Sequence, residues 1–315
     1  MVKKIQSVFV FLFVFSCSTT LMANETAKTY FPGTFGSYWV YEDQDGNELT
    51  RTIDEGEEIA GETYNIFIYE PDIEDWANYA YHFLPSLYSV NDEGITCLIG
   101  DEIEKTTKAC LIKQMEVLTK MTKKMVEDNP PPEAPNLSFD INYEVNVEAQ
   151  DDFALFPIAA TPNEKWDTTQ IKAKVSMQYE IRGVPDEFLG ADEIPKIIFE
   201  FNITETGNLL GTETVETQVG TFEDCLKIEY RTATTMEVLP PEQHVTSNPP
   251  GESLTTLWLA PNVGIVKFHQ KTEDIFLKTI PTSEFPEFHS STAVKTFELT
   301  KYEIKTTESE SNTSD

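Results

Sequence analysis

Strict alternation of apolar and polar residues most constrains the fold of this chain, and it is cleanest in LSFDINYEVNVEA (137–149). IKAKVSMQYEIR (171–182) and KIIFEFNIT (196–204) repeat the pattern. Side chains of a strand point alternately to its two faces, so each segment is predicted to be a strand with one buried and one wet face. Such strands belong to antiparallel sheets, which disfavours a doubly wound parallel fold. The predicted class is mainly β, built from antiparallel sheet.

Turn residues divide the remaining strand-like segments into hairpins. In LWLAPNVGIVKF (257–268), Pro261 fixes φ and Gly264 is free to adopt a positive φ, so this stretch is predicted to be a turn between two strands and not a site. Asp45-Gly46 predicts a two-residue hairpin loop within 37–53. Gly220 predicts a turn or bulge at the start of a strand that continues to residue 232.

One segment, 105–128, departs from the strand pattern. Its apolar residues recur at spacings of three and four, which predicts an amphipathic helix inserted into the β fold. The proline-rich NPPPEAPN (129–136) is predicted to end the helix and to space it from the next strand. The helix is expected to pack on its own sheet, although its lysines and methionines also suit a partner or a membrane surface.

The N-terminus carries an export signal. Lys3 and Lys4 precede an apolar run, 8–15, which has the length of a secretory leader and is too short for a membrane span. Cleavage after Ala23 fits the small-residue rule, and VFSC resembles a lipobox that would acylate Cys17. Both outcomes stay open, so the protein is expected in the periplasm, at the cell surface or outside the cell, either soluble or as an outer-membrane lipoprotein.

These signals predict five parts of the chain. They are a signal peptide (1–23, or 1–16 if Cys17 is acylated), an N-terminal β region (24–104), the helix with its proline spacer (105–136), a C-terminal β region (137–305) and a disordered tail (306–315).

Charge restricts the partners. The formal net charge is −31, and the acids are spread along the chain. Such a surface repels nucleic acid and anionic lipid headgroups, so we expect no nucleic-acid partner and membrane contact only through a lipid anchor.

The cysteines suggest one cross-link. Cys97 and Cys110 are close in sequence, and in an oxidising compartment they are the natural pair for a disulfide. Cys225 has no histidine nearby in sequence and is interpreted as a structural thiol.

Motifs for chemistry are missing from the sequence. The four histidines are scattered without metal-ligand spacing, and there is no nucleophile elbow, phosphate-binding loop or dinucleotide fingerprint. DQDGNE (43–48) resembles the start of a calcium loop, but its glycine comes too early and no bidentate glutamate follows. We therefore assign no catalytic residue, no metal site and no cofactor.

Five segments together resemble an uncharacterised family of exported bacterial β-rich proteins. The chain opens with Phe-Pro, a glycine and Trp-x-Tyr, and later has a Gly-Thr-Phe strand and an Ala-Pro-x-x-Gly-x-Val-Lys hairpin. The five segments are YFPGTFGSYWVYEDQDG (30–46), YAYHFLPSLYSVNDEGI (79–95), FPIAATPNEKW (156–166), VGTFEDCLKIEY (219–230) and LWLAPNVGIVKF (257–268). The resemblance implies a curved antiparallel sheet or incomplete barrel, broadly like periplasmic lipoprotein carriers, and it implies no activity.

Two functions are consistent with the sequence. The first is a non-enzymatic envelope protein whose curved sheet binds a lipophilic or protein partner. The alternative is an exported hydrolase that acts through a pair of carboxylates. A dry apolar concavity would favour binding, whereas two acids facing each other across a cleft would favour hydrolysis.

Overall fold

A computed structural model describes residues 29–76, 79–91, 93–130, 132, 136–183, 196–240, 251–273 and 292–306. The predicted leader, Cys17 and the tail from residue 307 lie outside these ranges. Within them the chain is mainly β, with one long helix, α2 (Gly100–Asp128). No described helix combines the length and the apolar character that a membrane span requires.

The described strands form one 13-stranded antiparallel sheet that does not close into a barrel. Its spatial order is β6-β8-β9-β10-β11-β12-β13-β1-β2-β3-β4-β5-β7. In chain order, the strands are β1 (Tyr38–Asp43), β2 (Glu48–Ile59), β3 (Glu62–Glu70), β4 (Leu87–Val90), β5 (Gly94–Leu98), β6 (Ser138–Ala149), β7 (Asp152–Pro157), β8 (Lys165–Arg182), β9 (Ile197–Thr217), β10 (Gly220–Leu239), β11 (Ser253–Ala260), β12 (Gly264–Glu273) and β13 (Thr292–Glu303). The predicted fold class is confirmed.

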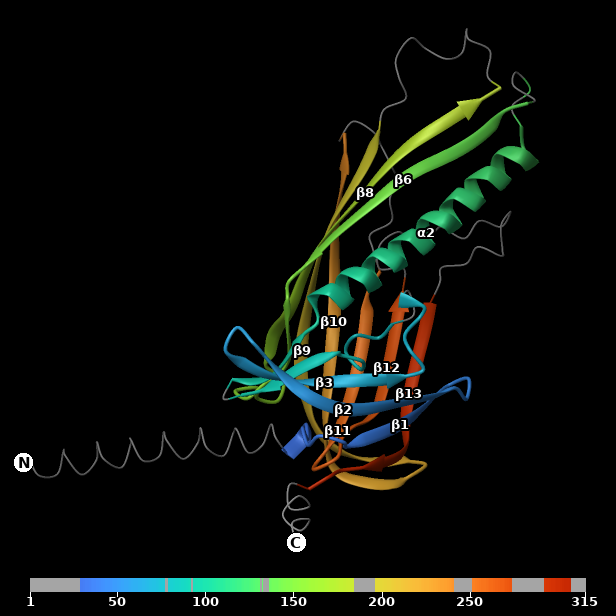
Figure 1. The fold of residues 1–315 in the computed structure, drawn as a ribbon. Helices are drawn as coiled ribbons and strands as arrows, with labels where there is room; N and C mark the ends of the chain where they lie inside the picture. Colours follow the sequence, from blue (N-terminus) through green and yellow to red (C-terminus); the bar gives the residue numbers. More distant parts are fainter. Residues whose placement is uncertain are drawn as a thin grey trace, which may run out of the picture.

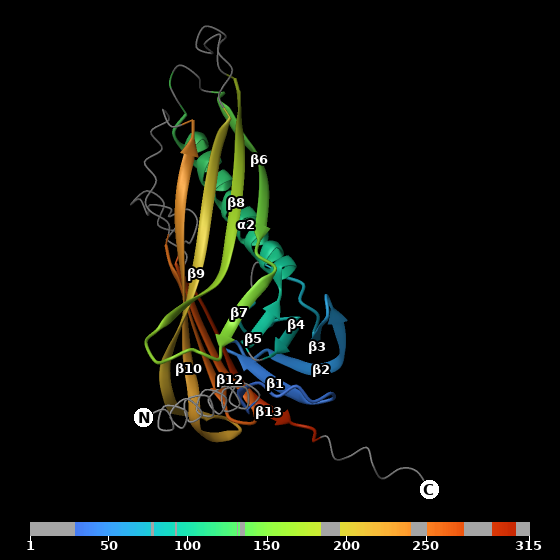
Figure 2. The same cartoon turned by 90° about the vertical axis from the view of Figure 1, so that its left-hand side faces the viewer.

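The sheet bends so that the part containing β1, β2 and β3 forms a second layer over its middle strands. The strands β1, β2 and β3 cross the lower parts of β10, β11, β12 and β13, and α2 packs along β6 in the upper part of the molecule (Figures 1 and 2). The N-terminal and C-terminal β regions share this sheet, because Tyr38 of β1 pairs with Glu303 of β13. The main core fills the space between the layers.

The alternation seen in the sequence is also the alternation of burial. Ile141 and Val145 of β6 are buried, whereas Asn142, Glu144 and Asn146 are exposed. The long strands bend at irregularities in register, such as those between Asp167 and Thr169 and between Lys227 and Ile228. Bulges of this kind let one strand belong to both the upper and the lower part of the sheet.

Side-chain hydrogen bonds connect β7, the last strand of the sheet, to β8 and β10, which do not pair with it. The indole Nε1 of Trp166 in β8 donates to the carbonyl of Ala154, 3.0 Å away, and the hydroxyl of Tyr230 in β10 donates to the carbonyl of Leu155 at 2.8 Å. The Trp166 ring lies over Gly207, where an added Cβ would come within 2.3 Å of ring atoms. A glycine is needed there because the ring occupies the space of a side chain.

The stretch 260–264 is a turn, as predicted. Asn262 has φ 59° and Gly264 has φ 93°. The turn is held from outside by the indole of Trp39, which donates to the Val263 carbonyl at 2.7 Å, and by the hydroxyl of Tyr41, which donates to the Ile265 carbonyl at 2.9 Å.

The structure changes the predicted bounds of the helix and of the first hairpin loop. The helix begins at Gly100 rather than near Lys105, because the amides of Ile99 and Gly100 donate to the Asp151 carbonyl and so fix the first turn against β7. The hairpin around Asp45-Gly46 exists, but its loop is longer than predicted and covers 44–47. Asp43 stabilises this longer loop by accepting hydrogen bonds at 2.8 Å from the amides of Asp45 and Asn47.

The predicted disulfide between Cys97 and Cys110 is not present, because both residues are thiols in the structure. Cys97 lies in β5, within the core, whereas Cys110 is carried about 15 Å along the helix axis from Gly100. The charges near the two thiols also differ: Arg51 and Glu102 act on Cys97, and Lys295 and Lys113 act on Cys110.

Candidate functional site

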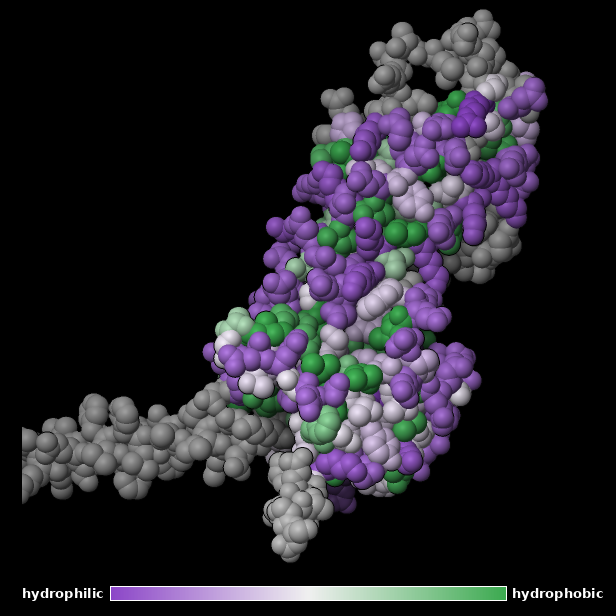
Figure 3. Space-filling model, viewed as in Figure 1, coloured by the Kyte–Doolittle hydropathy of each residue, from purple (hydrophilic) through white to green (hydrophobic). Residues whose placement is uncertain are grey.

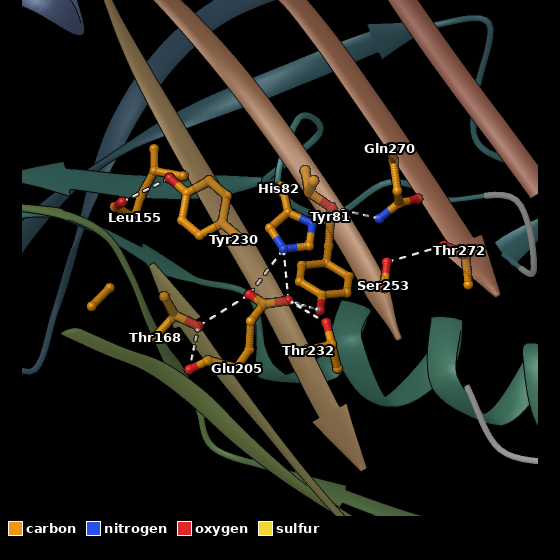
Figure 4. Close-up of polar contacts among 12 residues, drawn as sticks. Tyr81, His82, Leu155, Thr168, Glu205, Tyr230, Thr232, Ser253, Gln270 and Thr272 are labelled. Carbon is orange, nitrogen blue, oxygen red and sulfur yellow. Dashed lines mark hydrogen bonds and ion pairs between the residues drawn. The ribbon is translucent and has the colours of Figure 1, made fainter. Parts of the chain in front are cut away.

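An ion pair lies inside the molecule between β9 and the segment 79–86, which is the last part of the connection from β3 to β4. His82 Nε2 is 2.9 Å from both carboxylate oxygens of Glu205, and each side chain is 1% exposed (Figure 4). This pair could not be predicted from local sequence, because the two residues are 123 positions apart. Glu205 nevertheless stands at an inward position of β9, between Ile203 and Gly207, where an apolar residue is usual.

Three hydroxyl groups complete the surroundings of the Glu205 carboxylate. Thr168 donates to Oε1 at 3.0 Å, Thr232 donates to Oε2 at 2.9 Å, and Tyr81 donates to Oε2 at 3.2 Å. Burial by itself would raise the pKa of Glu205, but the His82 charge and the hydrogen bonds from His82, Thr232 and Thr168 outweigh it and lower the pKa. The carboxylate is therefore ionised at neutral pH, and His82 Nε2 must donate to it.

Aromatic rings enclose the imidazole of His82. Tyr81 stacks on it with 4.2 Å between ring centroids, and Phe153 and Tyr230 pack against it at 5.4 and 5.1 Å. Burial, and next the nearby Glu205 charge, raise the pKa of the Tyr81 and Tyr230 hydroxyls well above the ordinary value. The pair has no exposed face with which to meet a substrate, so its arrangement ties segment 79–86 to β8, β9 and β10.

The ion pair belongs to a polar belt on the inner face of the long strands. Glu205, Thr232, Ser253 and Thr272 are successive register partners in β9, β10, β11 and β12. The Ser253 and Thr272 hydroxyls are hydrogen bonded at 3.0 Å, and Gln270 donates to Thr255 at 3.0 Å in the next row (Figure 4). These bonds satisfy polar side chains within an otherwise apolar interior.

A second buried charge, Arg51 of β2, is held by aromatic rings. Its guanidinium carbon lies 4.7 Å from the centre of the Trp39 ring and 4.5 Å from that of Phe67. It donates to the Tyr41 hydroxyl at 2.8 Å, and no carboxylate among the described residues forms an ion pair with it. Burial raises the pKa of Tyr41 to about 12, although the Arg51 charge acts to lower it. This arrangement stabilises a cation through ring faces rather than through an anion.

An open concave surface lies on the opposite, outer face of the upper sheet. It is a groove of about 420 Å³ that crosses β6, β8, β9 and β10. It is lined by Asn146, Glu148, Lys172, Ala173, Lys174, Glu200, Phe201, Asn202, Thr235 and Glu237. We name it the sheet groove. A second, smaller groove near the end of α2 is occupied by the ion pairs of Lys123 with Asp140 and of Arg182 with Glu180.

Strand register arranges the lining of the sheet groove in two rows. One row runs from Asn146 through Lys174 and Glu200 to Glu237, and Lys174 forms an ion pair with Glu200 at 2.9 Å. The other row consists of Glu148, Lys172, Asn202 and Thr235. The lining therefore offers ammonium, carboxylate, amide and hydroxyl groups to solvent.

The residues singled out in the sequence do not assemble into this groove. Cys97 and Cys110 lie in and near the core, and Cys17 lies outside the described residues. Cys225 is buried, and burial raises the pKa of its thiol to about 11. Within the described ranges, no group of three or more His, Cys, Asp or Glu residues could hold a metal ion.

Comparisons with known proteins give two distant likenesses. A scan against protein-family models matched none, and no curated protein matched the sequence. One solved structure, described as "a putative lipoprotein from Parabacteroides distasonis", is 13% identical with a TM-score of 0.35 and covers 87% of this chain and 98% of its own. Another, from Bacteroides fragilis, is described as "a putative exported protein with YmcC-like fold"; it is 15% identical with a TM-score of 0.33 and covers 87% and 99%. Likenesses at these TM-scores carry no argument about function.

Proposed function

We propose that the protein is an exported, non-enzymatic binding protein of the cell envelope and that its partner binds in the sheet groove. The observation that carries this proposal is the contrast between the two polar clusters. The His82–Glu205 cluster has acid and base groups but no access for a substrate. The sheet groove is open, and its side chains are arranged by the register of four rigid strands.

A protein partner suits the sheet groove better than a lipophilic one. Its lining carries Lys172, Lys174 and three glutamates, whereas ligands rich in apolar surface bind in predominantly apolar pockets. On the face seen in Figure 3, apolar residues are scattered in small groups among hydrophilic ones. The partner is thus expected to bring its own charges and hydrogen-bonding groups.

Export rests on the leader sequence. The intact mass of the mature protein is expected to correspond either to a chain that begins at Asn24 or to one that begins at an acylated Cys17. A mature product that retains Met1 would contradict export and, with it, a role in the envelope.

Site-specific cross-linking tests the binding role. A photoreactive amino acid placed at Asn202, in the groove, is expected to give a discrete protein adduct in cells of the source organism. The matched control is Glu216, which is also an exposed residue of β9 but lies outside the groove. Adducts of equal yield at both positions, or at neither, would contradict the proposal.

The alternative hydrolase retains one specific carboxylate pair. Glu200 and Glu237 are direct register partners on β9 and β10 within the groove, and opposed carboxylates are the machinery of glycoside hydrolysis. Glu200 is already paired with Lys174, which favours a binding role for this carboxylate. Turnover of a glycan library by the protein, abolished in Glu200→Gln and in Glu237→Gln, would establish the alternative.

A further inference from the structure

Three charged side chains of the sheet groove are left open to a ligand. Within the described part of the chain, the ammonium of Lys172 and the carboxylates of Glu148 and Glu237 form no ion pair or hydrogen bond. The neighbouring pair Lys174 and Glu200 is closed at 2.9 Å, so these strands do permit cross-strand pairing. The groove thus presents negative, positive and negative groups in the order β6, β8 and β10.

The spacing of these groups follows from the sheet. Glu148 is opposite Lys172 on the adjacent strand, and Glu237 lies two residues beyond Thr235, which ends the same row. With strands about 4.8 Å apart and about 3.4 Å per residue, the backbone position of Lys172 is about 5 Å from that of Glu148 and about 12 Å from that of Glu237, and the two glutamates are about 16 Å apart. Same-side residues of an extended peptide recur about every 6.8 Å, so its residues i, i+2 and i+4 span about 14 Å. Lysine side chains are long enough to span the differences between the spacing of the groove residues and that of the peptide residues.

We infer that the sheet groove binds an extended peptide segment of a partner protein whose alternate residues are positive, negative and positive, as in Lys-x-Glu-x-Lys. This inference rests on the proposed binding function and names the ligand class for that site. The peptide would cross the strands, with its two cations at Glu148 and Glu237 and its carboxylate at Lys172. The apolar atoms of Ala173 and Phe201 contribute to the lining beneath it.

A binding measurement with short peptides tests this inference. The probe is a fluorescein-labelled nine-residue peptide with Lys-Thr-Glu-Thr-Lys at its centre, titrated with the mature protein and followed by anisotropy. Glu148→Gln and Glu237→Gln are each expected to weaken binding about two- to fivefold, as for exposed ion pairs. Glu144→Gln is the matched control, because Glu144 lies on the same face of β6 but outside the groove; its binding should be unchanged.

Lys172→Gln separates local recognition from general attraction to an acidic protein. This variant makes the protein more negative, so general attraction predicts tighter binding of the probe, whose central segment has a net positive charge. Recognition in the groove predicts binding weakened about two- to fivefold. A charge-inverted peptide with Glu-Thr-Lys-Thr-Glu is expected to bind at least tenfold more weakly than the probe.

Several results would overturn the inference. These are no binding of the probe at millimolar concentration, tighter binding by Lys172→Gln, or equal effects of Glu144→Gln and Glu148→Gln. Self-association of the protein that is lost in Glu237→Gln would also overturn it, because the occupant would then be a second copy. If the peptides fail while the cross-link at Asn202 persists, only the ligand class is wrong; loss of both removes the binding role as well.

Discussion

Glu205 and His82 meet inside the protein with 2.9 Å between the imidazole Nε2 and both carboxylate oxygens, although 123 positions separate them in the chain. The pair joins a segment without regular secondary structure to the middle of β9. Its hydrogen bonds to Thr168 and Thr232 extend this attachment to β8 and β10. The geometry makes the pair a structural link, and it leads to two predictions.

Removing one partner of the pair should be strongly destabilising. Glu205→Ala leaves the buried His82 without an acceptor for its Nε2 proton, so we expect a loss of about 3–5 kcal/mol in the free energy of unfolding in urea. The double variant His82→Phe with Glu205→Leu removes both polar partners and should cost less than Glu205→Ala alone. The exposed Glu216→Ala serves as the control, with a change below about 0.5 kcal/mol. A cost below about 1 kcal/mol for Glu205→Ala would contradict the structural role.

The same pair should contribute to the pH dependence of stability. The pKa of Glu205 is lowered below its ordinary value of 4.5 in the folded protein, because the His82 charge and three side-chain hydrogen bonds outweigh burial. Its contribution is thus complete above about pH 4.5 and is lost as the pH falls through the folded-state pKa. The stability difference between wild type and Glu205→Gln, from urea melts, should shrink as the pH falls below 4.5. A constant difference between pH 7 and pH 3 would show that the carboxylate has no lowered pKa.

Arg51 is predicted to respond differently to two replacements. Its buried guanidinium has ring faces and the Tyr41 hydroxyl as partners, so the charge is costly to hold in the interior. Arg51→Met keeps much of the volume and removes the charge, and we expect it to be neutral or to stabilise by about 1–4 kcal/mol. Arg51→Ala leaves a cavity among the rings and should destabilise by about 2–5 kcal/mol. Thermal and urea melts compare the two; a Met variant as unstable as the Ala variant would mean that the charge itself stabilises the fold.

The strands and the helix could be predicted from the sequence because their periods match their geometries. Residues 137–149 alternate cleanly, and β6 occupies nearly the same range with Ile141 and Val145 inside. Inward positions also hold two buried ionisable residues: Arg51 lies between Leu49 and Ile53 in β2, and Glu205 lies between Ile203 and Gly207 in β9. A polar residue at an inward position was therefore a usable signal, and it was missed.

The partners of these residues could not be predicted from the sequence. His82 lies in a segment without alternation, so nothing local indicates that it faces Glu205. The sheet groove depends on the order β6-β8-β9-β10, which omits β7. Only that order aligns Glu148 with Lys172 and Asn202. The disulfide was predicted from the spacing of two cysteines in an exported chain, and it is absent because the continuous helix carries Cys110 away from β5.

The turn at 261–263 gives the last prediction. Gly264 has φ 93°, and a Cβ there would meet Pro32 at an ordinary contact distance of 3.5 Å, so Gly264→Val should act through backbone strain alone and cost about 1–3 kcal/mol. Asn262 also has a positive φ, 59°, so Asn262→Ala should cost about 1 kcal/mol, whereas Asn262→Gly should be nearly neutral. Urea melts of the three variants should give this ranking. The Asn262 side chain is exposed, so its loss should leave peptide binding in the sheet groove unchanged. A stable Asn262→Gly protein that no longer bound its partner would show that the turn is also a site.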